Sequence, residues 1–352
     1  MRIFSCPSCG CTLIFENRHC SRCGHRIGYE PESDRMVALN AAGNDWIDTR
    51  HGGQFRFCEN AELEACNWLL PADSRYRFCL ACRHNRTVPN LNDSANINRW
   101  RVLEQAKHRL FYTLRRLDLP LVDRHTRHDG LAFDFLADPP GGPRVMTGHA
   151  SGLVTIALRE ADDVERERMR VEMGEYYRTV LGHFRHETGH YFWNVLVRDG
   201  GRLDACRALF GDDRADYAEA LQRHYENGAP TDWQADFVSA YATMHPWEDF
   251  AETWAHYLHI VDTLETGASY GLSITPHVAE KALLSTRIDF NPFAVEDFTT
   301  LSDAWLPMTY LLNSLNRAMG LRDVYPFVLT PRILEKMAFI HRLVRDHRAG
   351  AA

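Results

Sequence analysis

The stretch His186-Glu187-Thr188-Gly189-His190 carries two histidines four residues apart, with a glutamate directly after the first. On a helix this spacing places both imidazoles on one face, where they can bind the same zinc ion. We expect this helix to cover about 175–198, because apolar residues recur around the motif at helical spacing and Asp199-Gly200-Gly201 is a typical helix end. Glu187 would then lie beside the metal and accept a proton from an activated water molecule.

A catalytic zinc needs a third protein ligand, and a second predicted helical segment over about 237–262 supplies candidates. Residues 237–246 lead into the later helix, and Pro246 suits its first turn. Within it, Glu248, Glu252 and His256 follow one another at intervals of four residues and therefore line one face. Apolar and aromatic residues border this face, which is unusual for solvated charges. We predict Glu248 as the third ligand and Glu252 as acceptor of the outer N–H of a ligating histidine. The two roles can be exchanged, and Asp249 is a third candidate for the ligand.

The motif His-Glu-x-x-His followed by a helix with Glu-x-x-x-Glu resembles the gluzincin clan of metallopeptidases. This resemblance implies that Glu248 ligates zinc and that Glu252 supports a histidine. Lethal-factor-like members of the clan place a tyrosine seven residues before the ligating glutamate, and Tyr241 stands at that distance from Glu248. The resemblance therefore implies that Tyr241 stabilises the oxyanion of the tetrahedral intermediate. His256 is an alternative donor for this role, and Tyr241 could equally be a core residue of its helix.

Nearly the whole chain resembles a bacterial family of zinc-binding metallopeptidases that carry an N-terminal zinc-ribbon domain. The resemblance rests on Cys6-Pro7-Ser8-Cys9-Gly10, Cys66-Asn67-Trp68-Leu69, Thr147-Gly148-His149, Phe184-Arg185-His186-Glu187 and His245-Pro246-Trp247-Glu248-Asp249-Phe250-Ala251-Glu252. It implies an α+β fold, in which a mainly helical zincin-like metallopeptidase domain with a small sheet follows small zinc-ribbon modules. It supports the fold and the metal more than any particular substrate.

Two Cys-x-x-Cys pairs near the start of the chain, each followed by glycine, have the spacing of a four-thiolate zinc ribbon. Their members are Cys6, Cys9, Cys20 and Cys23. A segment of about thirty residues buries too little apolar surface to fold unaided, so we expect metal binding to supply its folding energy.

A second group of four cysteines contains one tight pair and two more widely spaced members. Its residues are Cys58, Cys66, Cys79 and Cys82, with His51 or His84 as substitutes for an outer ligand. We predict a second structural zinc here, so that the protein would hold one catalytic and one or two structural Zn²⁺ ions. Disulfides are the alternative, but the chain starts without the apolar core of a signal peptide and has no run of eighteen apolar residues. We therefore expect a cytoplasmic, reducing location without a membrane anchor, where zinc is favoured over disulfides.

The length of 352 residues and the hydrophobic content of 45% allow a sizeable core. We predict a zinc ribbon at 1–30, a second cysteine-rich zinc module at 31–95 and the zincin-like metallopeptidase domain at 96–352. Within the last, 131–136 and 152–158 have the composition of strands. We expect 152–158 to be an edge strand that pairs with extended substrate backbone.

Charge is unevenly distributed along the chain. The segment 75–116 holds ten Arg or Lys against Asp93 and Glu104, a local +8 that leaves about −15 on the remainder of a chain whose total is −7. Such a segment could contact nucleic acid or an acidic partner. We favour the alternative, a solvated helix over about 97–117 with the buried stripe Trp100, Leu103, Ala106, Leu110, Leu114 and Leu117.

These observations predict a zinc-dependent metallopeptidase that hydrolyses a peptide or protein substrate. His186, His190 and Glu248 would hold the metal, and Glu187 would act as general base. The alternative is a zinc-ribbon interaction or nucleic-acid-binding protein whose peptidase domain does not cut, or cuts only when a partner activates it. The intact Glu187 favours the enzyme, because a purely structural metal site does not need that carboxylate.

Overall fold

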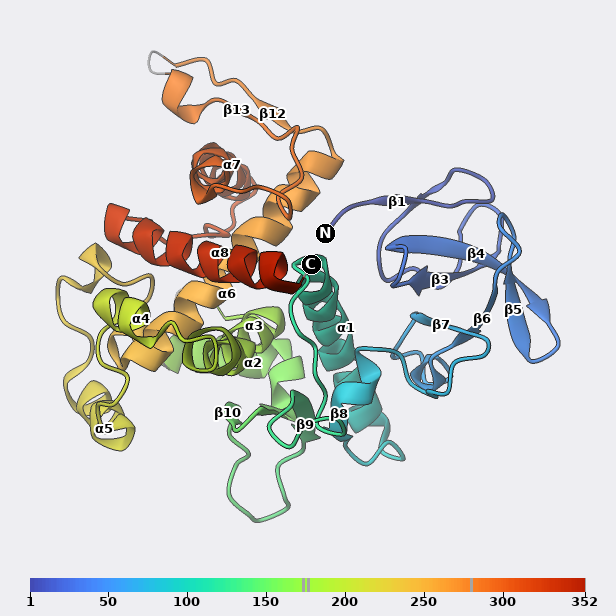
Figure 1. Cartoon of the computed structure of the whole chain (residues 1–352), viewed down its shortest axis with the longest axis horizontal. Helices are drawn as coiled ribbons and strands as arrows, with labels where there is room; N and C mark the ends of the chain where they lie inside the picture. Colours follow the sequence, from blue (N-terminus) through green and yellow to red (C-terminus); the bar gives the residue numbers. More distant parts are fainter. Residues whose placement is uncertain (173–174, 176–177, 279–280, 352) are drawn as a thin grey trace. The chain divides into compact units, whose positions relative to one another are not determined.

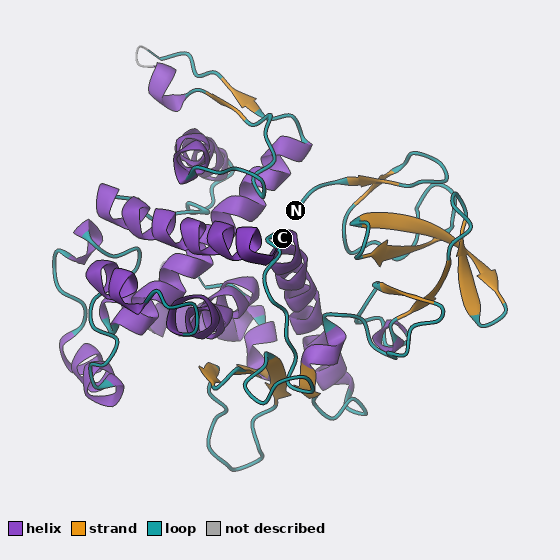
Figure 2. Ribbon diagram, in the orientation of Figure 1, coloured by secondary structure: helices purple, strands orange, loops and turns teal. Residues whose placement is uncertain are grey.

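The computed structural model describes residues 1–172, 175, 178–278 and 281–351. These residues form an α+β fold with eight α-helices and several small sheets (Figure 2). The chain divides into two compact units, one made of residues 1–112 and 121–162, the other of residues 113–120 and 163–352.

The N-terminal part of the first unit is built from short antiparallel strands (Figure 1). A hairpin of β1 (Phe4–Ser5) and β2 (Thr12–Leu13) is followed by a five-stranded sheet. The strand order of that sheet is β3 (Arg26–Glu30), β4 (Arg35–Ala42), β5 (Asp45–Asp48), β6 (Gln54–Phe57) and β7 (Leu69–Pro71). The predicted domain boundary at residue 30 falls between two neighbouring strands of this sheet, so both predicted modules contribute to it.

A second sheet of the first unit shows where one strand prediction is wrong. Its order is β10 (Gly148–Ala150), β11 (Leu153–Ala157), β9 (Ala132–Leu136) and β8 (Asn85–Thr87). The strands predicted at 131–136 and 152–158 are therefore confirmed, but β11 is not an edge strand. Ser151 and Gly152, with φ of 47° and 81°, turn the chain so that β10 pairs with the outer side of β11. The main chain of β11 is paired on both sides and cannot accept an added strand.

Helix α1 (Ser94–Arg116) buries the predicted apolar stripe. The six members, of which the last follows directly after the helix, are at most 8% exposed: Trp100, Leu103, Ala106, Leu110, Leu114 and Leu117. Near its end Tyr112 packs on the aromatic rings of Phe15 and Tyr29, at centroid distances of 5.2 and 6.1 Å. This part of α1 therefore shares a core with the zinc-ribbon segment.

The second unit is mainly helical and is organised around α6, which packs against α3, α4, α7 and α8. Its helices are α2 (Asp163–Glu172), α3 (Val180–Phe192), α4 (Leu203–Phe210), α5 (Tyr217–Asn227), α6 (Pro246–Ser269), α7 (Phe298–Ala318) and α8 (Pro331–Ala351). A π-helical segment, Trp193–Arg198, continues α3, and β12 (Ser273–Ile274) pairs with β13 (Thr286–Arg287).

Short 3₁₀ segments occur in both units, at Glu59–Ala61, Cys82–His84, Leu158–Ala161, Trp233–Ala235, Tyr241–Thr243 and Lys281–Leu284.

The predicted limits of the two metal-site helices need correction. Helix α3 begins at Val180, after the cap Thr179, rather than near 175; residues 176 and 177 lie outside the described part of the chain. Helix α6 begins at Pro246, as expected for its first turn, and the predicted range was too long because it started at 237. Proline disfavours helical backbone in the residue before it, and His245 is accordingly extended, with φ of −156°. Its side chain caps the new helix by accepting a hydrogen bond from the Trp247 amide at 3.1 Å.

A buried ion pair joins α6 to α8. Asp249 and Lys336 are 0% and 2% exposed, and their Oδ2 and Nζ atoms lie 2.6 Å apart. Burial raises the pKa of Asp249 to about 7 even though Lys336 opposes the shift. The Asp249 carboxyl group therefore depends on Lys336 to remain ionised in the core.

Replacing Lys336 by methionine should destabilise the fold by about 3–5 kcal/mol, because it leaves a buried carboxylate unpaired. We expect the loss in chemical denaturation of the zinc-saturated protein, with Arg342→Met, an exposed change on the same helix, as the control. The double variant Lys336→Met/Asp249→Asn should recover part of the loss. A cost for Lys336→Met no larger than that of the control would contradict the importance of this pair.

Candidate active site

The candidate site lies where α3 and α6 approach most closely. A Cβ atom added to Gly189 would lie 2.9 Å from Ala251 Cα and 3.2 Å from Ala251 O. Any larger residue at this position would push the helices apart. Glycine is unfavourable inside a helix, and this contact explains its place between Glu187 and His190.

The close approach brings the three predicted ligands together. The ligand atoms of His186, His190 and Glu248 all lie within 4.8 Å of one another. Glu248 Oε2 is 2.9 Å from His186 Nε2, and Glu248 Oε1 is 3.4 Å from His190 Nε2. Two imidazole nitrogens and one carboxylate form the donor set of many catalytic zinc sites.

Glu252 occupies the supporting position that the sequence predicted for it. Its Oε1 accepts a hydrogen bond from His186 Nδ1 at 2.6 Å, and its Oε2 accepts one from Ser239 Oγ at 2.5 Å. Burial raises the pKa of Glu252, but its hydrogen bond with His186 outweighs this effect and lowers the pKa to about 2. Glu252 therefore remains a carboxylate that holds the His186 ring in orientation.

This hydrogen bond also tests whether a metal fits the cluster. When His186 donates from Nδ1, its neutral ring presents a lone pair from Nε2 toward Glu248 Oε2. Two acceptors at this separation repel each other unless a cation lies between them. The donor set therefore fits Zn²⁺, and the arrangement favours Glu248 over Glu252 as its ligand.

Glu187 lies on α3 between the two histidines and is only 8% exposed. Burial raises its pKa, although the neighbouring His186 and His190 oppose the shift. A raised pKa brings a carboxylate closer to the range in which it accepts and returns protons near neutral pH. Trp247 packs on the His190 ring at a centroid distance of 3.9 Å and limits that ring's freedom.

Two tyrosines border the cluster, and sequence analysis found only one of them. The ring of Tyr241 lies 6.0 Å from that of His186. Tyr217, the first residue of α5, donates a hydrogen bond to Glu248 Oε1 at 2.9 Å. Burial and the charge of Glu248 raise the pKa of both tyrosines, so both hydroxyls remain protonated and able to donate at neutral pH. No spacing rule connects Tyr217 to a residue 31 positions later, and Ser239 was missed for the same reason.

Two other candidates have different partners. Asp249 pairs with Lys336 and is not a member of the ligand cluster. His256 lies one turn beyond Glu252, where its Nδ1 is 2.7 Å from the Tyr325 hydroxyl and its ring packs edge-on against Phe327. The structure therefore does not bring His256 into the ligand cluster, and its contacts are those of a core residue.

The burial of His256 should make the fold acid-sensitive. Burial lowers its pKa to about 4, whereas histidine in an unfolded chain titrates near 6.5. The neutral ring therefore stabilises the fold fully above pH 6.5, and this contribution, about 3 kcal/mol, is lost as pH falls toward 4. We expect His256→Asn to flatten the fall in unfolding free energy across this window. Zinc release at low pH affects both proteins alike, and an unchanged slope in the variant would contradict this assignment.

The cysteines form two clusters within the first unit. In the first, Cys6 and Cys23 Sγ lie 3.7 Å apart and Cys9 and Cys20 Sγ 3.5 Å apart, separations suited to one tetrahedral zinc. The second cluster consists of Cys58, Cys66, Cys79 and Cys82, all buried and with sulfur atoms within 4.8 Å of one another.

The histidines predicted as substitutes do not join this second cluster. His84 is buried, its Nδ1 lies 2.7 Å from the Leu80 carbonyl oxygen, and its ring packs on Phe111. Burial lowers the pKa of His84 to about 4. His51 is exposed. Neither residue belongs to a group of converging ligand atoms in the described residues.

Comparisons with known proteins identify two family matches along the chain. A zinc-ribbon domain family matches residues 3–93, and a family described as "Putative zinc-binding metallo-peptidase" matches residues 96–343. The second match covers more than half of the chain. The protein belongs to this metallopeptidase family.

Three mycobacterial relatives support the same relationship along the whole chain. They are uncharacterized proteins of Mycobacterium bovis and of two strains of Mycobacterium tuberculosis. Each is 44% identical over 348 residues, which cover 98% of this chain and 96% of the relative. No solved structure matches this member of the zinc-binding metallopeptidase family. In its described residues, no helix has both the length and the apolar character needed to cross a membrane.

Proposed function

We propose that the protein is a gluzincin-like, zinc-dependent metallopeptidase that hydrolyses peptide bonds within a zincin-like fold. The observation that carries the proposal is the convergence of His186, His190 and Glu248, with Glu187 buried between the two histidines on α3. A structural metal site has no use for such a carboxylate, whereas hydrolysis requires a base at this place.

When bound, zinc would lower the pKa of a coordinated water and polarise the substrate carbonyl. Glu187 accepts the proton of the attacking water and later delivers it to the leaving amine. Its burial, which raises its pKa, suits both steps. Glu252 and Ser239 keep the His186 ring in position throughout.

The tyrosine hydroxyls are the proposed donors to the oxyanion. Tyr241 is the first candidate, with Tyr217 beside it, because both border Glu248 and both retain their protons. A preorganised donor of this kind contributes about 2.7–4 kcal/mol to catalysis when it meets the developing charge. His256 is the weaker candidate because Tyr325 already occupies its Nδ1.

The proposal is tested by incubating the zinc-loaded protein with a mixed peptide library and identifying cleavage products by mass spectrometry. We expect new termini that are absent after treatment with a chelator and reappear when zinc is restored. His190→Ala, which removes one ligand, should give none. Identical products from the parent and from His190→Ala would reveal a contaminating peptidase and would overturn the assignment.

The metal content forms part of the same proposal. We expect one catalytic zinc and two structural zincs, one in each cysteine cluster. The eight cysteines of the two clusters converge in groups of four without disulfides, which supports zinc as their partner. Zinc-bound thiolates are in turn typical of the reducing, cytoplasmic location that we propose.

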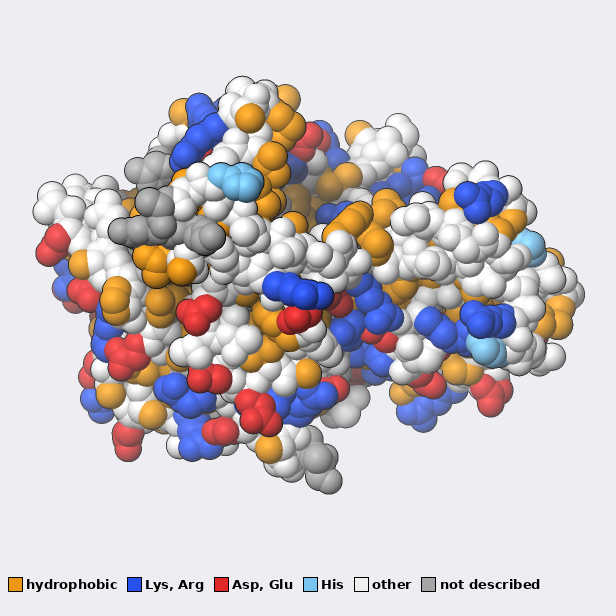
Figure 3. All heavy atoms as spheres, turned by 90° about the horizontal axis from the view of Figure 1, so that it is seen from above, with side chains coloured by type: hydrophobic (Ala, Val, Ile, Leu, Met, Phe, Trp, Pro, Cys, Tyr) orange, Lys and Arg blue, Asp and Glu red, His pale blue; other side chains and the backbone are white. Residues whose placement is uncertain are grey.

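The alternative is a protein that binds nucleic acid or an acidic partner through residues 75–116. Eight of the ten cations in this segment contact carboxylates of the same protein. The pairs are Arg77 with Glu59, Arg83 with Asp123, Arg86 with Asp134, Arg99 with Asp162, Arg101 with Glu64, Lys107 with Glu104, Arg109 with Glu16, and Arg116 with Glu265. Basic and acidic side chains also lie side by side on the face drawn in Figure 3. We therefore favour the enzyme; steeply salt-dependent binding to DNA or RNA would support the alternative.

A further inference from the structure

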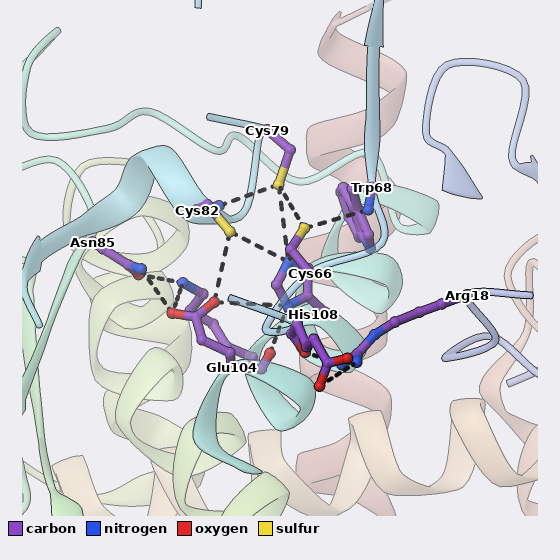
Figure 4. Close-up of polar contacts among 10 residues, drawn as sticks. Arg18, Cys66, Trp68, Cys79, Cys82, Asn85, Glu104 and His108 are labelled. Atoms are coloured by element: carbon purple, nitrogen blue, oxygen red, sulfur yellow. Dashed lines mark hydrogen bonds and ion pairs between the residues drawn. The ribbon is translucent and has the colours of Figure 1, made fainter. Parts of the chain in front are cut away.

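A histidine from α1 lies among the sulfur atoms of the second cysteine cluster (Figure 4). His108 Nε2 is 3.2 Å from Cys66 Sγ, 3.5 Å from Cys82 Sγ and 3.9 Å from Cys79 Sγ. In a tetrahedral zinc site, with a Zn–S distance of about 2.3 Å and a Zn–N distance of about 2.0–2.1 Å, nitrogen and sulfur ligands lie about 3.6 Å apart. The three measured distances bracket this value.

The other ring nitrogen of His108 determines which atom faces the sulfurs. Nδ1 lies 2.6 Å from the carbonyl oxygen of Glu104. A carbonyl oxygen can only accept, so Nδ1 carries a proton, and a neutral ring held in this way presents its lone pair at Nε2. Histidines that ligate metals are commonly held in this way, by an N–H bond from the outer nitrogen to a carbonyl oxygen or carboxylate.

Two backbone amides approach the same sulfurs. The amide of Trp68 donates to Cys66 Sγ at 3.3 Å, and the amide of Cys82 donates to Cys79 Sγ at 3.5 Å. Such donors stabilise thiolates that bind a metal. Cys66, Cys79 and Cys82 are therefore prepared as ligands by their surroundings.

The burial of the site also favours a histidine over a fourth cysteine. Cys58, the other member of the cluster, is 1% exposed and His108 is 4% exposed. Zinc with four thiolates carries a net charge of −2, whereas zinc with three thiolates and a neutral imidazole carries −1. The smaller charge costs less to bury. The adjacent Glu104 and Lys107 pair with each other at 2.9 Å, so they add no net charge to offset the larger value.

We propose that His108 is a metal ligand, and that the second cluster binds zinc through Cys66, Cys79, Cys82 and His108. Cys58 is then not one of the four ligands, although its sulfur atom lies within 4.8 Å of the other three sulfurs. Glu104 also borders the site, with its Oε2 3.7 Å from Cys82 Sγ. Three thiolates and one imidazole already complete a tetrahedral zinc shell, and Lys107 and Asn85 hold the Glu104 carboxylate through its Oε1. The proposal is independent of peptidase activity.

The consequence concerns how the protein is held together. The three cysteines belong to the segment matched by the zinc-ribbon family, whereas His108 belongs to the segment matched by the metallopeptidase family. A metal bound in this way fastens α1 to the cysteine module. The two family segments would therefore share one metal site and would not fold as independent modules.

The test is cadmium-113 NMR of the full-length protein loaded with ¹¹³Cd and labelled with ¹⁵N in its histidines. Each site gives its own resonance, and a sulfur-rich site with one nitrogen differs from a four-sulfur site and from the sulfur-free candidate active site. We expect one sulfur-rich resonance to show coupling to a histidine nitrogen. That coupling should disappear in His108→Ala and should persist in Cys58→Ser.

A matched control tests whether the histidine coupling comes from the first cysteine cluster instead. His25 Nδ1 lies 3.3 Å from Cys23 Sγ, so His25→Ala removes a histidine that borders the first cluster, and the coupling should persist in it. If His108→Ala does not fold, the coupling in the parent and in His25→Ala still decides the matter. Two four-sulfur resonances without histidine coupling in the parent, or a coupling lost in His25→Ala, would overturn the proposal.

Discussion

Replacing Glu187 by glutamine should abolish peptide hydrolysis and leave the zinc content of the protein unchanged. The amide has nearly the shape of the carboxylate but cannot accept a proton, and loss of a positioned general base lowers the rate by about 10²–10⁴-fold. Glu187 is not one of the three ligands, so the metal should remain. Turnover measured on a cleaved library peptide, together with zinc stoichiometry from native mass spectrometry, checks both parts.

The control for this prediction is Glu335→Gln, the same chemical change at an exposed position on α8. It should have parental activity and parental zinc. Hydrolysis by Glu187→Gln at a tenth of the parental rate or more would mean that another group accepts the proton. Loss of zinc together with activity would instead place Glu187 among the groups that hold the metal.

Alanine substitutions of Glu248 and Glu252 should affect the metal in different ways. Glu248→Ala removes a ligand that lies 2.9 Å from His186 Nε2, so this variant should bind one zinc fewer than the parent. Glu252→Ala removes only the acceptor of the His186 Nδ1–H bond. Loss of such a supporting partner lowers metal affinity by about 10–100-fold, so this variant should still fill the site at saturating zinc.

Native mass spectrometry at saturating zinc gives the stoichiometry, and titration against a competing chelator gives the affinity. Both cysteine clusters provide an internal reference, since they should remain filled in both variants. The reverse result, with zinc lost from Glu252→Ala and retained in Glu248→Ala, would exchange the two roles. If both variants bound zinc with parental affinity, neither Glu248 nor Glu252 would contribute to this metal site.

Local spacing allowed the metal-binding motifs to be predicted from the sequence. His186 and His190 share a helix face wherever that segment is helical, and Cys6-x-x-Cys9 and Cys20-x-x-Cys23 form knuckles by their own turns. The apolar stripe of α1 follows from the same helical period, and the structure confirms it. Pro246 indicated the first turn of α6 in the same way, and the structure confirms it; only the extension of the predicted range back to 237 is wrong.

The partners of these motifs depend on contacts between distant segments. The sequence favoured Glu248 over Glu252 as the ligand but allowed the two roles to be exchanged, since both lie on one face of the same helix. In the structure Glu248 lies near both histidines, whereas Glu252 contacts the outer nitrogen of His186. Tyr217 reaches Glu248 from another helix, and His108 reaches Cys66 across 42 positions. Helical period and ligand spacing are properties of a few consecutive residues, so the sequence alone determined the motifs that could bind a metal. Only the tertiary structure decided which of them meet, because that depends on how helices pack.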